Sequence, residues 1–301
     1  MDWLNHPSYA RLRDRLIRRL RMRTYQFKTL RPVLFLCGGR ESPRRERIAD
    51  YLRKYHPQKL LFNAEDVWNQ IASRTALNAL QSERELAQLS DVVLIVVESP
   101  GTFAELGAFS LHEALRPKLL LILDDRHRGV ESFLNAGPIR WVDAESHYRP
   151  SIQADFSVIL KAMPEIENRL ERIGMRRADE IKEFGDIGSS PKHLLFLLCD
   201  LVAMVGPAPE AHCKYYLDHI FDGKVSWSAG DLLSLAVSMK ILTRIKLDDS
   251  DPLYFRPLKE DSLQAFQSEH MFSVVRERAK FLSVLQGIEG FQKALDAARE
   301  R

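Results

Sequence analysis

Short, uninterrupted apolar runs alternate with helical patterns of apolar and polar positions between residue 32 and about residue 145. Such runs, flanked by turn residues, are typical of strands buried on both faces. The expected strands are 32–37, 59–62, 91–97, 118–123 and a short fifth strand at 139–142. Strands that alternate with helices predict an α/β domain with a parallel, doubly wound sheet.

Helical patterns fill the intervals between these strands. A polar helix is expected over 43–55, with Ser42 as its N-cap and Pro43 as its first residue. Further helices are expected over 75–88 and 102–115. Each of the first three crossovers between the expected strands therefore carries one helix.

The second half of the chain has a different pattern. A charged, helical stretch at 150–187 ends in a Gly/Ser/Pro boundary, and helices follow at 192–204, 210–221 and 228–240. Two apolar stretches, 242–247 and 253–258, flank an acidic turn and predict a hairpin. Three helices followed by a hairpin predict a winged-helix domain, and further helices at 261–298 close the chain.

Charge bears on what this predicted winged helix binds. Residues 191–260 hold eight Lys or Arg and nine Asp or Glu, and the helix in the DNA-reading position carries Lys240 alone. Phosphate contacts need several cations on the docking face. We therefore expect this domain to dock protein rather than to read a DNA sequence.

The first 31 residues are strongly basic, with nine Lys or Arg against two Asp. Leucines at helical spacing within them predict an amphipathic helix. A solvated arginine face on a docked helix explains the pattern, and so does contact with a polyanion, which we favour. A membrane surface fits less well, because the apolar stripe lacks Trp and Phe. The candidate nucleic-acid contacts are Arg11, Arg15, Arg18 and Arg19.

The cysteine spacing and the lengths of the apolar runs indicate the cellular location that we expect for the protein. Cys37, Cys199 and Cys213 are far apart and form no metal-ligand spacing, so we expect reduced thiols, no structural metal and a cytoplasmic location. We expect no membrane association: no apolar run approaches 18 residues, and the N-terminus lacks the layout of a signal peptide.

Polar and glycine residues follow the expected strands: 38–40, 65–66, 98–102 and 124–125. In a parallel sheet these loops meet at one edge, where ligands bind. Neither a G-x-G-x-x-G fingerprint nor a P-loop is present. The candidate substrate-binding residues are Gly38, Gly39, Arg40, Asp66, Glu98, Ser99, Gly101 and Thr102.

Glu105 is the candidate catalytic carboxylate at this edge. The spacing Thr102-x-x-Glu105 also fits a capping box, with Thr102 as N-cap and Glu105 bonded back to it. The pattern alone leaves the structural and the catalytic interpretation open. The joint placement of the strand-end loops favours a site.

Several segments together carry a family resemblance: Phe35–Gly39, Ala64–Trp68, Asp91–Val97, Glu98–Ser110 and Gly137–Arg140. They resemble nucleoside 2′-deoxyribosyltransferase-like proteins, which have a flavodoxin- or Rossmann-like sheet, and more closely the effector proteins of bacterial retrons. The resemblance is specific over 32–143 and loose beyond. It implies that Glu105 is catalytic and that the reaction is N-glycosidic cleavage, with NAD as a substrate and not as a cofactor. It also implies partners: a retron reverse transcriptase, multicopy single-stranded DNA with its RNA, and a higher-order assembly.

One departure separates the chain from true deoxyribosyltransferases. Those enzymes commonly place an Asp just before the glycine turn, where this chain has Glu98 and Ser99. The alternatives that stay open are a nucleoside-monophosphate phosphoribohydrolase, a deoxyribosyltransferase and a non-catalytic nucleic-acid scaffold. The expected segments are a basic helix (1–31), a deoxyribosyltransferase-like catalytic domain (32–148), a helical connector (149–190), a winged-helix-like domain (191–260) and C-terminal helices (261–301).

Overall fold

The computed structural model describes residues 3–21, 26–27, 30–65, 79–175, 185–248, 251–259, 266–267 and 273–299. The chain divides into two units. One runs from Arg31 to Ala178, and the other joins Met1–Leu30 to Asp179–Arg301. The five segments expected from the sequence are finer than this division and stay a prediction.

The first unit is built on a five-stranded sheet in the order β3-β2-β4-β5-β6, and every neighbouring pair is parallel. This confirms the predicted α/β class with a parallel sheet. Its strands are β2 (Val33–Cys37), β3 (Leu60–Asn63), β4 (Val92–Val97), β5 (Leu119–Asp124) and β6 (Ile152–Ala154). Its helices are α2 (Pro43–Tyr55), α4 (Ala79–Leu89), α5 (Pro100–Leu111), α6 (Arg140–Glu145) and α7 (Met163–Glu171).

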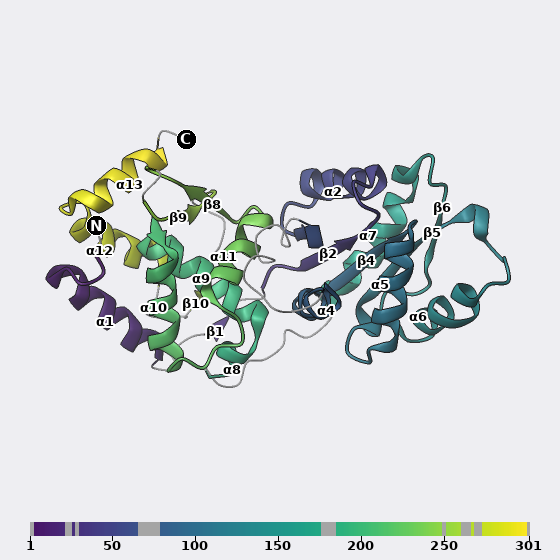
Figure 1. Cartoon of the computed structure of the whole chain (residues 1–301), viewed down its shortest axis with the longest axis horizontal. Coiled ribbons are helices and arrows are strands. Elements are labelled where there is room, and N and C mark those ends of the chain that lie inside the picture. Colours follow the sequence, from purple (N-terminus) through teal and green to yellow (C-terminus); the bar gives the residue numbers. More distant parts are fainter. Residues whose placement is uncertain are drawn as a thin grey trace. The chain divides into compact units, whose positions relative to one another are not determined.

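The four longer strands are buried at every position, which is why each is apolar in the sequence except for Asn63 and Asp124 at the ends of β3 and β5. Alternate strand residues on one face, such as Leu34 and Leu94, pack against Ile48 of α2 and Ile166 of α7. Helices α4 and α5 lie on the opposite face (Figure 1). The sheet is thus covered on both sides, and its polar chemistry is confined to the strand ends.

The fifth strand lies elsewhere than predicted. Residues 135–145 form a π-helical turn (Asn135–Ile139) that leads into α6, and β6 comes only afterwards. Ile139 and Val142 are spaced three apart and both buried, while Trp141 between them is 40% exposed. That is the burial pattern of a helix face. The prediction of a strand at 139–142 is therefore wrong.

The second unit is mostly helical. Its helices are α1 (Pro7–Arg21), α8 (Gly185–Ser189), α9 (Pro191–Val205), α10 (Glu210–Phe221), α11 (Ala229–Ser238), α12 (Val274–Leu285) and α13 (Glu289–Arg299). Strands β7 (Ala208–Pro209), β9 (Tyr254–Pro257) and β8 (Leu242–Ile245) form an antiparallel sheet, and β1 (Gln26–Phe27) pairs with β10 (Phe266–Gln267). The predicted series of three helices and a hairpin is confirmed in α9, α10, α11 and β8–β9.

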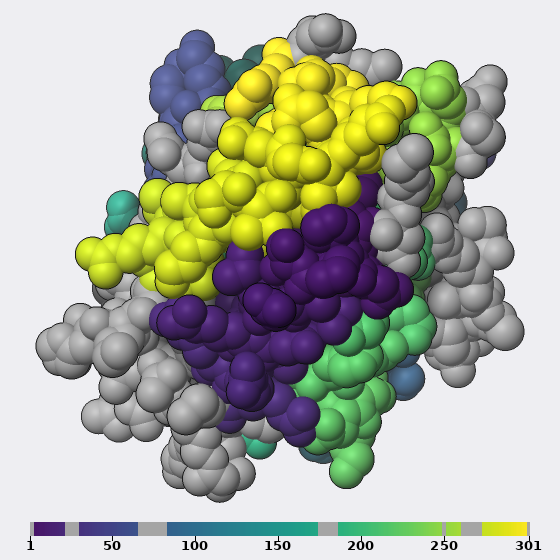
Figure 2. Space-filling model, turned by 90° about the vertical axis from the view of Figure 1, so that its left-hand side faces the viewer, coloured from purple at the N-terminus to yellow at the C-terminus, as the bar shows by residue number. Residues whose placement is uncertain are grey.

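The basic N-terminal helix belongs to this second unit. Its apolar stripe, including Leu16 and Leu20, is buried. The Tyr9 hydroxyl lies 2.8 Å from that of Tyr216 on α10, and both rings are fully buried. Figure 2 shows α1 between α10 and the two C-terminal helices. Among the described residues, no helix is long and apolar enough to cross a membrane.

Candidate active site

The carboxyl ends of the parallel strands place the predicted loops along one edge of the sheet. Cys37 ends β2 and leads into Gly38 and Gly39, while Glu65 follows β3. Glu98 and Ser99 connect β4 to α5, and Asp124 ends β5. Asp66 lies outside the described residues, so its expected role in binding ribose stays a prediction.

The start of α5 differs from the capping box expected at Thr102 and Glu105. Ser99 is the N-cap, and its Oγ accepts from the Thr102 N–H at 3.3 Å. Thr102 Oγ1 accepts from the N–H groups of Glu98 and Ser99 at 3.0 and 2.9 Å. Thr102 is therefore fully buried in a structural role, at the third helical position. The capping interpretation of Glu105 is wrong, because the cap lies three residues earlier.

Glu105 thereby moves into the second turn of α5, clear of the helix terminus. Its Oε2 atom is buried and has no hydrogen-bond partner among the described residues. Burial, reinforced by the negative charge of Glu83, raises the pKa of Glu105 to about 8. The Cys37 thiol hydrogen-bonds to the carboxylate, and together with the Arg45 charge it opposes this rise in pKa. Perturbed carboxylates of this kind concentrate at functional sites.

The thiol of Cys37 responds to the same surroundings. Burial and the neighbouring Glu105 carboxylate raise its pKa well above the ordinary value. Cys37 therefore stays a protonated donor at neutral pH. The thiol is a hydrogen-bonding support for the carboxylate and not a nucleophile.

Arg45 is a site component that the sequence analysis missed. Its Nη1 atom donates to both carboxylate oxygens of Glu65, at 2.8 and 2.9 Å, and its side chain is only 5% exposed. A Cβ atom at Gly38 would lie 2.9 Å from the Cβ of Arg45, so only glycine fits beneath this arginine. One signal existed: an arginine in the first helical turn opposes the helix dipole, which suggests a tertiary partner.

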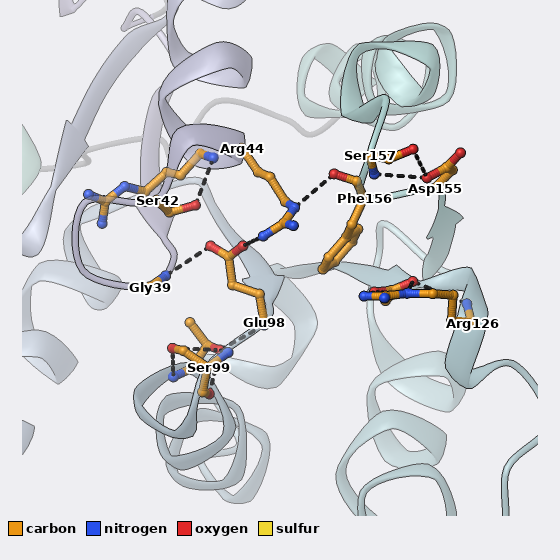
Figure 3. A network of polar contacts seen from close by, with 12 residues as sticks. Gly39, Ser42, Arg44, Glu98, Ser99, Arg126, Asp155, Phe156 and Ser157 are labelled. Atoms are coloured by element: carbon orange, nitrogen blue, oxygen red, sulfur yellow. Dashed lines mark hydrogen bonds and ion pairs between the residues drawn. The ribbon is translucent and has the colours of Figure 1, made fainter.

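Glu98 is tied into the scaffold by both of its oxygens (Figure 3). Its Oε1 accepts from the Gly39 N–H at 3.0 Å, and its Oε2 accepts from Arg44 Nη1 at 2.7 Å. The side chain is 7% exposed. Glu98 therefore fixes the glycine turn to the start of α2, and its oxygens are already engaged where a sugar contact was expected.

The remaining predicted residues of this edge are more open. Arg40 is exposed after the glycine turn, and its expected role in binding phosphate stays a prediction. Gly101 is exposed too, and the Ser99 Oγ atom is the nearest to its missing Cβ, at 3.8 Å. The structure thus brings Gly39, Glu98, Ser99 and Thr102 into one bonded turn.

The predicted nucleic-acid contacts on α1 divide into two groups. Arg11, Arg15 and Arg18 are exposed. Arg19 forms an ion pair with Glu277 of α12 and is only 24% exposed. Arg19 therefore serves the packing of α1, while the other three present their charges to solvent.

Comparison with known proteins identifies the family of this chain. A family model described as "STM3845 retron effector protein" matches residues 41–247, which is more than half of the chain. The chain belongs to this family of retron effectors.

Two similar proteins of Escherichia coli, one from retron Ec86 and one from retron Ec73, are each named "putative ribosyltransferase/DNA-binding protein". The Ec86 protein is 36% identical over 120 residues, covering 38% of this chain and 39% of the relative. The Ec73 protein is 32% identical over 125 residues, covering 39% and 40%. The matched segments thus span about two fifths of either relative.

Proposed function

We propose that the α/β unit is an N-glycosidase of the nucleoside deoxyribosyltransferase-like type. Its activity would hydrolyse NAD to nicotinamide and ADP-ribose, with Glu105 as the catalytic carboxylate. The observation that carries this proposal is the Glu105 carboxylate beside Cys37 at the carboxyl end of β2, with one buried oxygen that has no hydrogen-bond partner in the described part of the chain. Membership in a retron effector family and the ribosyltransferase name of the relatives support it.

The proposed cleavage of NAD depends on the positive charge of its nicotinamide ring. The C1′–N bond of NAD breaks as its electron pair leaves with nicotinamide, which becomes neutral, while positive charge develops on the ribose. A carboxylate stabilises or captures that oxocarbenium-like centre, and water then adds its hydroxyl to C1′ and releases a proton. The cationic nicotinamide ring favours the ionised form of Glu105, so substrate binding would lower the raised pKa of this group.

The same pKa supports a second candidate. With a value of about 8, Glu105 is mostly protonated at neutral pH and can act as a general acid toward a neutral leaving base. Nucleoside-monophosphate phosphoribohydrolases and deoxyribosyltransferases release such bases. The direction of the pH dependence separates the two: an ionised Glu105 gives activity that rises through pH 8, and a protonated one gives activity that falls.

The decisive experiment incubates the full-length protein with NAD and with nucleoside monophosphates and identifies the released bases by mass spectrometry. Glu105→Gln should lower cleavage of the true substrate by roughly a thousandfold, since it removes the charge that acts in the transition state. Glu113→Gln, at an exposed position just beyond α5, is the matched control and should retain activity. Full activity in folded Glu105→Gln protein would remove Glu105 from the mechanism.

We further propose that the retron reverse transcriptase and its multicopy single-stranded DNA restrain this activity, that the protein works in the cytoplasm, and that α1 contributes to nucleic-acid binding. The three exposed arginines of α1 support the last point, and the DNA-binding name of the relatives agrees with it. The series α9, α10, α11 and β8–β9 supports a winged helix, which we infer to dock protein.

Removing positive charges from α1 and from the hairpin in separate variants distinguishes their contributions to DNA binding. Replacing Arg11, Arg15 and Arg18 together by Gln should weaken single-stranded DNA binding about tenfold or more at moderate salt and reduce its salt dependence. The matched control replaces Lys240 and Lys246, two exposed lysines beside the hairpin, and should leave binding unchanged. A loss in the lysine variant without a loss in the arginine variant, measured by fluorescence anisotropy, would assign DNA contact to the winged helix instead.

A further inference from the structure

A cavity of about 500 Å³ lies at the carboxyl ends of β4, β5 and β6, and Glu105 is not part of its lining. Its lining includes Val97, Leu123 and Gln153 from the three strand ends. The Glu98–Arg44 ion pair lines it as well, so this cavity adjoins the glycine turn from the side of β5 and β6. A volume of this size suits a ligand as large as a mononucleotide.

Two phenylalanines contribute to its lining. Phe156, which is 6% exposed, lies under the Arg44 guanidinium at 5.1 Å, and Arg44 Nε donates to the Phe156 carbonyl at 2.9 Å. Phe103 of α5 contributes a second aromatic ring and is 40% exposed. Figure 3 shows Phe156 between the Glu98–Arg44 pair and Arg126. Planar, apolar surface of this kind accepts a stacked heterocyclic base.

The lining of the cavity also contains a polar side-chain atom without a hydrogen-bond partner among the described residues. Gln153 Oε1 is buried and has no hydrogen-bond partner among the described residues. A buried amide oxygen without a partner costs free energy, so a ligand that donates a hydrogen bond to it gains affinity. Glutamine pairs with adenine through the exocyclic N6 amine and a ring nitrogen, which is the complement that this position lacks.

Both acidic groups of the lining are neutralised by arginines of their own. Glu98 bonds to Arg44, and Asp124 accepts from Arg126 Nε at 2.9 Å. His127 and Arg128 follow on the same loop and are exposed, and the structure shows no ion pair for Arg128 among the described residues. The cavity therefore offers net positive charge toward solvent and suits a ligand with an anionic end.

We propose that this cavity binds an adenine nucleotide, with the base at Gln153 between the aromatic walls and the phosphate at Arg128 and His127. The ligand is either a free adenine nucleotide or the adenylate half of a dinucleotide. Only the second case rests on the proposed function. Both share the same recognition chemistry, and binding requires no cleavage.

The test uses the full-length Glu105→Gln protein, so that a substrate is not consumed. Calorimetric titration with AMP should give binding at least about tenfold tighter than with IMP, in which a carbonyl replaces the amine that Gln153 would bind. Gln153→Met, which keeps the side-chain volume, should abolish this preference. Arg128→Gln should weaken AMP several-fold and leave adenosine unchanged, and Arg140→Gln, an exposed arginine outside the lining, is the control.

Competition between AMP and NAD distinguishes a free adenine nucleotide from the adenylate half of a dinucleotide as the ligand. If NAD displaces AMP, the cavity holds the adenylate half of the dinucleotide, and Gln153→Met in the active protein raises the KM for NAD. If AMP and NAD bind together, the cavity belongs to a free nucleotide. Absence of AMP and ADP-ribose binding at millimolar concentration would overturn the proposal, and so would binding that neither Gln153→Met nor Arg128→Gln alters. AMP binding in a protein that cleaves no NAD would sink the proposed function alone.

Discussion

Each unit of this protein contains a glutamate with at least one carboxylate oxygen removed from solvent, and the two glutamates have different partners. Glu277 on α12 is 5% exposed and pairs with Arg19 of α1 and with Lys280, whose Nζ lies 2.7 Å from its carboxylate. Glu105 on α5 has a thiol for a neighbour and one oxygen without a bond among the described residues. The first glutamate joins helices, whereas the second carries an uncompensated desolvation cost.

The difference shows where to look for chemistry. A neutralised carboxylate contributes to packing and has little left to offer a ligand. A carboxylate whose pKa is raised to about 8 by burial can exchange a proton or accept positive charge near physiological pH. The contrast, and not burial itself, distinguishes the candidate site from the structural core.

The same substitution in both places should therefore have opposite effects on stability. Glu277→Gln removes the charge that Arg19 and Lys280 share and should destabilise the protein by about 2 kcal/mol. Urea unfolding monitored by circular dichroism measures this loss, with Glu289→Gln, an exposed glutamate of α13, as control. A change below that of the control would mean that α1 is held to α12 by apolar packing alone.

Glu105→Gln should instead stabilise the fold at alkaline pH. The folded pKa of about 8 lies above the ordinary value of 4.5, so the glutamate's contribution is complete below pH 4.5 and is lost as pH rises through 8. The neutral amide does not ionise, and we expect a gain of about 1 kcal/mol at pH 9, a rise of roughly 2–4 °C in Tm. Thermal unfolding at pH 5 and pH 9 tests the sign, since the advantage should vanish at pH 5.

The smallest expected effect concerns Arg45, a cation whose charge acts on Glu105. Arg45→Met removes a charge that lowers the pKa of this carboxylate, so the midpoint of the pH–activity profile should move upward by roughly half a pH unit. Arg47→Met, on the exposed face of the same helix, should leave the midpoint unchanged. A downward shift would contradict this account, because removing Arg45 and freeing the Glu65 carboxylate both raise the pKa of Glu105.

Much of the architecture could be predicted because burial on both faces leaves a simple signature. The strands β2, β4 and β5 are unbroken apolar runs, and Ser42 with Pro43 marks the start of α2 as predicted. Strand β6 was missed because its three residues, Ile-Gln-Ala, carry too short a pattern. The apolar residues at 139–142 fit a strand or a helix equally well until tertiary contacts decide.

Parts of the site could not be predicted for a related reason. Ser99 and Thr102 can each cap a helix by residue type, and only the backbone shows that Ser99 does so. The proximity of Cys37 and Arg45 to Glu105 depends on packing between separate elements. Sequence spacing carries no record of such contacts, although the arginine in the first turn of α2 was a usable hint.

Glu98 bears on how the proposed activity could be inhibited. Its two bonds hold the glycine turn and the start of α2 to the segment that carries Glu105, so the proposed catalytic carboxylate lies on a bonded support in the protein without substrate. Dismantling that support would break several bonds at once. We therefore expect an inhibiting partner to block substrate access to the site while the hydrogen bonds of Glu98 remain intact.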